Sequence, residues 1–152
     1  MNPALAAFVE TFDRAYDLSS WHGPNLKGAL RGVSAADALW RPQAGAHNIW
    51  ELAIHAAYWK YVVRRKLTGL ARGSFALKGS NWIASPQQPD AKAWKDILAL
   101  LENEHRQLRE AIVALGNADL SDPKKRRLLA GVAAHDLYHA GQIRLVRRLM
   151  KN

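Results

Sequence analysis

Two histidines, His135 and His139, stand four residues apart near the C-terminal end of the sequence. Both fall on the apolar stripe of a long predicted helix, where positions i and i+4 share one face with Cβ atoms about 5–6 Å apart. Two imidazoles at that separation can bind one metal ion, which would also offset the cost of burying two polar rings together. The pair alone is a weak signal, so a metal site requires a third ligand.

His55 is the candidate for that third ligand, because it lies between Leu52 and Trp59 on the inward stripe of a second predicted helix. If the two helices face each other, three imidazoles converge on one point. Three histidine ligands with an open fourth position are typical of catalytic rather than structural zinc-type sites. The alternative is three separate core histidines, each hydrogen-bonded to a backbone carbonyl or a tyrosine, and the residues leave both possibilities open.

Other polar residues could act beside such a metal. Glu51 is the best carboxylate candidate for a general base, with capping of a solvated helix start as the alternative. Gln142 shares the face of the histidine pair and either orients a ligand or substrate or bonds a neighbouring helix. Tyr138 and Tyr58 could donate a hydrogen bond to a developing anion, with buried aromatic packing as the default for both.

Five further residues have expected places around the site. His105 lies on the apolar stripe of a third helix, as a core residue, a pocket-lining residue or a fourth ligand. Asp136 should point about 100° away from His135, as a surface group or as a group behind the metal ligands that faces another helix. His47 reads as a capping or loop residue, and Trp50 and Trp82 are candidates for the mouth of a pocket.

The elements that must position these side chains are helical. Apolar periodicity predicts long helices over residues 3–20, 48–68, 90–116 and from 122 to the C-terminus, and no stretch alternates like a strand. Shorter helices are predicted near residues 25–30 and 34–41. Four long amphipathic helices predict an all-α four-helix bundle that spans residues 1–152 as a single domain. The irregular segment 70–89 is long enough to cross between the two ends of that bundle, and loops of this length are often functional.

Composition narrows the chemistry and the partners. The 152 residues include no cysteine, so a metal must be held by His and carboxylates, which suit Zn, Ni, Fe or Mn. No apolar run is long enough to span a bilayer and no signal peptide is recognisable, so we expect a cytoplasmic protein without a membrane partner. The net charge of +9 raises the possibility of nucleic-acid binding. No helix-turn-helix or zinc-finger pattern supports that possibility, so a small-molecule substrate ranks first, and a homodimer through outer helix faces is compatible with the pattern.

Two segments resemble a known family. The residues WRP at 40–42 and HNIWELAIH at 47–55 resemble the second-helix signature of the DinB-like superfamily. The residues HxxxHAGQI at 135–143 are similar to the last-helix signature of that family. The resemblance covers the whole chain in order, including the long loop between the second and third long helices.

The resemblance implies an up-down-down-up four-helix bundle in which the long loop makes the crossover. It implies a divalent metal, nickel or zinc most often, on His55, His135 and His139. It implies either an S-transferase that uses a low-molecular-weight thiol or a metal-dependent hydrolase, and a non-enzymatic metal-binding bundle with a stability or sensing role is the alternative. The lack of a convincing general base favours thiol transfer over hydrolysis.

Overall fold

The computed structural model describes residues 2–151, and the secondary structure within this range is helical, without strands. Three of its helices are single short segments of five residues that connect longer ones: α2 Leu26–Leu30, α3 Ala35–Leu39 and α6 Asn117–Ser121. The four long helices are α1 Pro3–Tyr16, α4 Ile49–Thr68, α5 Ala91–Val113 and α7 Pro123–Leu149. The predicted all-α class is therefore confirmed.

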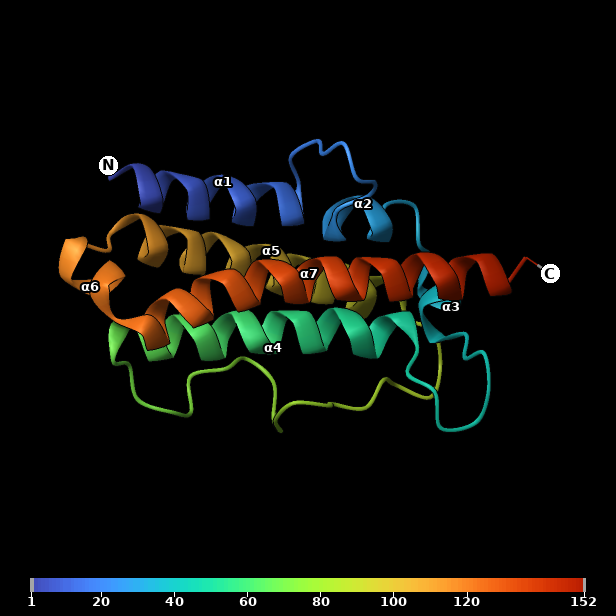
Figure 1. The fold of residues 1–152 in the computed structure, drawn as a ribbon. Coiled ribbons are helices and arrows are strands. Elements are labelled where there is room, and N and C mark those ends of the chain that lie inside the picture. The colour runs from blue at the N-terminus through green and yellow to red at the C-terminus, as the bar shows by residue number, and fades with distance from the viewer. Residues whose placement is uncertain (1, 152) are drawn as a thin grey trace.

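The long helices lie side by side (Figure 1). Helix α4 packs against both α5 and α7, and α1 packs against α7 and α5. The irregular segment that follows α4 runs back along the outside of that helix before α5 begins (Figure 1). This arrangement places one face of α4 against α7, which carries the histidine pair, and leaves another face of α4 beside the long loop.

The helix that was predicted over residues 3–20 ends four residues early, at Tyr16. Beyond that point side chains replace the helical hydrogen bonds. Arg14 donates to the Ser19 carbonyl, and the Asn25 amide donates to the Leu18 carbonyl. The third long helix likewise ends at Val113 rather than 116, and the short α6 that follows was not predicted.

Helix α4 begins where its capping residues place it. The Asn48 side chain accepts from the Glu51 backbone N–H at 2.9 Å, and the Glu51 carboxylate accepts from the Asn48 N–H at 3.4 Å, which completes a capping box. Gly69 ends the helix with φ +75°, a left-handed conformation that glycine adopts at no steric cost. Helix α7 begins at Pro123, after Asp122 caps the Lys124 N–H at 2.8 Å. These signals fix the positions of the three histidines along their helices.

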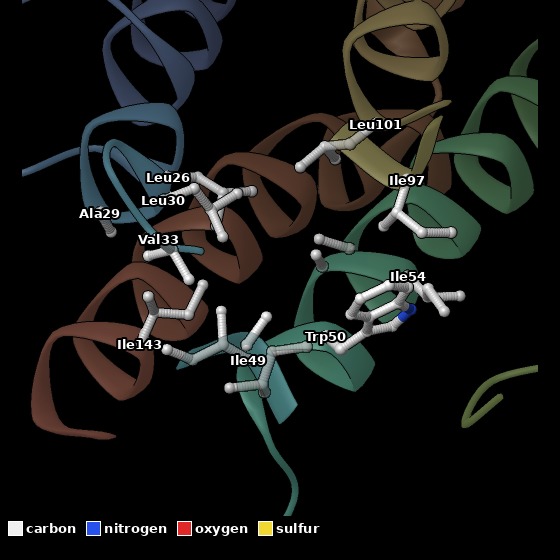
Figure 2. Close-up of a cluster of buried hydrophobic side chains, with 14 of the residues drawn as sticks. Leu26, Ala29, Leu30, Val33, Ile49, Trp50, Ile54, Ile97, Leu101 and Ile143 are labelled. Atoms are coloured by element: carbon white, nitrogen blue, oxygen red, sulfur yellow. The ribbon is translucent and has the colours of Figure 1, made fainter. Parts of the chain in front are cut away.

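Apolar side chains fill the interior in two clusters. One cluster joins α2, α4, α5 and α7 through residues such as Leu26, Ile49, Leu101 and Ile143 (Figure 2). The other joins α1, α4, α5 and α7 around residues that include Phe12. Each fully buried residue of this kind contributes about 1.5–3 kcal/mol to folding. Between the two clusters lies a layer of buried polar side chains: His55, Lys60, His105, Asp136 and His139.

No helix within residues 2–151 is long and apolar enough to cross a membrane.

Candidate metal centre

Three imidazoles meet where α4 faces α7. The Nε2 atom of His135 lies 3.1 Å from Nε2 of His55 and 3.0 Å from Nε2 of His139. The ligand atoms of the three residues all lie within 4.8 Å of one another. An ion bound tetrahedrally at about 2.0–2.1 Å keeps its ligand nitrogens about 3.3 Å apart, so the observed spacing is compatible with a bound metal. The predicted convergence of the three rings is confirmed.

The outer nitrogens of two rings are held by specific acceptors. Nδ1 of His55 donates to the backbone carbonyl of Asn81 at 3.0 Å, and Nδ1 of His139 donates to the side-chain oxygen of Gln142 at 2.6 Å. We assign the tautomers from these bonds, and in both rings the Nε2 lone pair then points inward. Outer bonds of this kind orient histidine ligands in metal proteins.

The hydrogen bonding of the third ring, His135, shows why a metal ion fits between the three rings. A proton on Nε2 of His135 can serve only one of the two lone pairs that face it, whereas one cation accepts a lone pair from all three rings. Nδ1 of His135 is itself buried without a hydrogen-bond partner among the described residues. The nitrogen-only donor set suits zinc, nickel, iron or cobalt better than calcium or magnesium.

Burial keeps the three rings neutral at pH 7. It lowers the pKa of His55, and it lowers the pKa of His135 to about 3, to which the neighbouring His139 and His55 add. Burial also lowers the pKa of His139 to about 4, against a smaller opposing effect of the Gln142 hydrogen bond. Neutral imidazoles are the form that binds a metal.

Trp82, from the long loop, covers one side of the cluster. Its ring stacks on His55 with centroids 3.8 Å apart and on His47 with centroids 3.5 Å apart. The tryptophan is 38% exposed, and its predicted place at a pocket mouth stays a prediction. Trp50, which was also predicted at a pocket mouth, is instead buried against Trp94, with ring centroids 5.1 Å apart.

Glu51 is occupied by other partners. Arg41 donates to its two oxygens at 2.9 and 2.7 Å, and His47 lies 3.0 Å from Oε2. Burial raises the pKa of this carboxyl, but the bonds from Arg41 and His47 outweigh burial and bring it down to about 2. The carboxylate is buried rather than solvated. Residues of the WRP and HNIWE segments therefore meet at the cap of α4.

The remaining candidates occupy different surroundings. Gln142 contacts its own helix, where it accepts from His139 and its Nε2 donates to the Tyr138 hydroxyl at 3.3 Å. Tyr138 is 64% exposed rather than packed, with its ring edge-on to His139. Tyr58 is half-buried among aromatic side chains of α4 and the loop, including Phe75.

Asp136 is fully buried and forms an ion pair with the equally buried Lys60 of α4. The prediction of a surface group is wrong, and the partner of Asp136 is a lysine of α4 rather than a histidine of the three-histidine cluster. Lys60 was not among the candidate residues of the sequence analysis. Its spacing from Ala56 and Val63 puts it on the buried face of α4, and that spacing was the available signal.

His105 belongs to this buried polar group and not to the three-histidine cluster. Its ring stacks between Tyr16 and Phe12, with centroids at 3.7 and 4.4 Å. Burial lowers its pKa to about 2, so the neutral ring can accept from Lys60 Nζ, which lies 3.3 Å from Nδ1. The core interpretation of His105 therefore agrees with the structure.

Comparison with known families gives one result. A family model described as the DinB superfamily matches residues 20–143, well over half of the sequence. The chain belongs to the DinB superfamily. No curated protein and no solved structure matched it.

Proposed function

We propose that this chain is a divalent-metal thiol S-transferase, which joins the sulfur of a low-molecular-weight thiol to an electrophilic substrate as the thiol proton and the substrate's leaving group depart, with His55, His135 and His139 as the metal ligands. The observation that carries the proposal is the inward convergence of three neutral rings: Nε2 of His135 lies 3.1 and 3.0 Å from Nε2 of His55 and His139, and all three ligand atoms lie within 4.8 Å of one another. Nickel and zinc are the proposed metals, because both accept three imidazoles. The up-down-down-up order of the four long helices is part of the proposal, supported by the loop that runs back along α4 (Figure 1).

When bound, a divalent ion on three neutral imidazoles lowers the pKa of a ligated thiol or water toward neutrality. The chain itself contains no cysteine, so a thiol must come from a small molecule. Asn81 and Gln142 orient the ligand rings, and Trp82 shields one side of them from solvent. The protein groups thus bind the metal and orient its ligand rings, and no protein nucleophile is needed.

Thiol transfer is favoured over hydrolysis by the surroundings of the carboxylates. Hydrolysis works best with a general base beside the water. Glu51 is paired with Arg41, and Asp136 is paired with Lys60. Neither carboxylate is free to take a proton, whereas thiol transfer needs less help because a low thiol pKa already supplies the nucleophile.

The first experiment is elemental analysis of natively purified protein, followed by thiol-dependent turnover of a panel of electrophiles with the identified metal. We expect about one divalent ion per chain. His139→Ala should lose both the metal and turnover, whereas His22→Ala, which replaces an exposed histidine of the loop between α1 and α2, should keep both. Full activity of a variant lacking all three cluster histidines would refute the proposal.

A non-enzymatic metal-binding role is the second candidate. The observation that favours it is the enclosure of the site: His55 and His139 are only 6% and 3% exposed, and Trp82 stacks over the first. This role predicts a full complement of metal with no turnover on any thiol or ester of a broad panel. Faster turnover in Trp82→Ala than in the wild type would instead indicate a covered enzyme site.

A further inference from the structure

A groove lies beside the candidate metal centre, between α4 and the loop that follows it. Its volume is about 820 Å³, within the range of small-molecule sites. Trp59 and Asn81 form the end nearest the metal centre, and the Trp59 indole N–H donates to the Asn81 side chain at 3.0 Å. The same Asn81 accepts from His55 through its backbone carbonyl, so the groove and the cluster share a wall.

The charged residues that line this groove are all of one sign. Four cations line it, and no carboxylate does: Arg65, Lys66, Arg72 and Lys78. None of the four is in an ion pair within residues 2–151. Positive charge is therefore concentrated in this groove, as it also is in a second pocket near the C-terminal end of α7 that is lined by Arg144, Arg147, Arg148 and Lys151.

Two neighbouring arginines on α4 show the contrast directly. Arg64 donates to Glu104 of α5 at 3.1 Å, which gives its charge a partner inside the protein. Arg65 lines the groove, is only partly exposed and forms no ion pair within residues 2–151, and its Nε, like that of Arg64, is buried without a hydrogen-bond partner. An unpaired guanidinium nitrogen of this kind is costly unless an anion or water supplies the acceptor.

The apolar part of the lining is aromatic and held in place. Phe75 of the loop packs against Tyr58 and Tyr61 of α4, with both pairs of ring centroids 5.4 Å apart. The Tyr61 hydroxyl accepts from the backbone N–H groups of Gly73 and Ser74, at 3.1 and 3.3 Å, which ties the loop to the helix. The groove therefore combines rings that can contact an apolar body with cations that can bind an acid.

We propose that this groove binds the acidic end of a small aromatic or apolar anion, the substrate or thiol whose reacting group is presented to the neighbouring histidine cluster. The role of this groove as a substrate or thiol subsite rests on the proposed function, whereas binding of the anion to the groove does not require the metal. A small molecule is the proposed occupant, because a volume of about 820 Å³ is within the range of small-molecule sites.

The test uses 4-phenylbutanoate and its neutral and cationic analogues, 4-phenylbutanamide and 4-phenylbutylammonium, in calorimetric and NMR titrations of the full chain. Metal-free and zinc-loaded protein are titrated in parallel. We expect the carboxylate to bind at least about tenfold more tightly than either analogue in both forms and to shift the Trp59 indole resonance. Equal binding of all three analogues would overturn the proposal.

A pair of charge-reversed variants locates the effect. Arg72→Glu/Lys78→Glu should weaken phenylbutanoate binding about tenfold, because it reverses two exposed charges of the groove. Lys124→Glu/Arg127→Glu makes the same change in net charge at the exposed start of α7 and should leave the affinity within about twofold. Equal weakening in both variants would mean that overall charge, and not the groove, attracts the anion.

Two further outcomes would also overturn the inference. Binding confined to the zinc-loaded protein, and lost in His139→Ala, would mean that the carboxylate ligates the metal. Tighter groove binding by a decathymidylate than by phenylbutanoate would assign the groove to nucleic acid. Failure of the metal proposal leaves phenylbutanoate binding to metal-free protein intact, so the two proposals fail separately.

Discussion

The atoms behind the three imidazoles determine how firmly a metal can be held. Gln142 accepts from Nδ1 of His139 at 2.6 Å and thereby turns Nε2 inward. Gln142→Leu removes that acceptor at similar volume, so we expect about tenfold weaker zinc affinity with an unchanged helical spectrum. A competition titration against a chromophoric chelator measures the change.

The matched control for that substitution is Gln107→Leu. Gln107 is also a half-buried helical glutamine, and it makes no side-chain hydrogen bond within the described residues. Its substitution should leave zinc affinity unchanged. Equal affinities in the two variants would show that the Gln142 contact does not orient the ring.

The pH dependence of stability should report on Glu51. Its folded pKa of about 2 lies below the unfolded value of about 4.3, so the carboxylate contributes stability above pH 4.3 that is lost as the pH falls toward 2. We expect Glu51→Gln to cost about 3 kcal/mol at pH 7 and its penalty to shrink as the pH approaches 3. Urea unfolding of both proteins at several pH values measures this.

Glu110→Gln is the control for the acid series, since Glu110 is exposed and pairs only with Arg106 on its own helix. It should change stability little at any pH. A penalty for Glu51→Gln that stays constant from pH 7 to pH 3 would contradict the role of its ionised form.

At the scale of elements, a buried ion pair joins α4 to α7. Burial lowers the pKa of Lys60, and its pairing with Asp136 opposes that shift. Asp136→Leu leaves the lysine buried without its partner, so we expect a loss of about 3–5 kcal/mol in unfolding free energy. Lys60→Met/Asp136→Leu replaces both charges with apolar groups and should recover most of the loss.

Urea denaturation of the two single variants and the double variant gives a complete cycle. A double variant as unstable as Asp136→Leu alone would indicate that packing, and not the unpaired charge, causes the loss. Zinc affinity measured in the double variant then shows whether the pair also sets the register of α7, which carries His135 beside Asp136.

At the scale of the whole molecule, we expect a bound metal to add stability to a fold that also forms without it. The polar layer lies between two apolar clusters, whose burial we expect to hold the fold together without an ion. At a free metal concentration 100 times its Kd, binding adds about 2.7 kcal/mol, which corresponds to a rise in Tm of about 5–10 °C. Calorimetry with and without a chelator measures this rise.

His139→Ala should show no difference in Tm between the two conditions, because it lacks one ligand. Loss of the helical circular dichroism signal at 25 °C on chelation would contradict an independent apolar fold and favour a structural metal.

The sequence by itself determined the helices and the ligand candidates. Apolar periodicity and capping residues act locally, so Asn48 and Asp122 already indicated where α4 and α7 begin. Once those starts are set, the spacing of His135 and His139 follows from helix geometry alone. The third candidate, His55, followed from its place on the inward stripe of its helix.

Only the tertiary structure decided which polar groups are partners. Lys60 and Asp136 are 76 residues apart, and although the spacing of Lys60 along α4 indicates burial, nothing local indicates its partner. The fold likewise pairs Glu51 with Arg41, which removes the leading carboxylate candidate from the site. It also places the long loop beside α4, and the two form a basic groove. Such pairings depend on how helices and loops meet in space. A charge that is buried without a partner is costly, and here the partner comes from another segment of the chain.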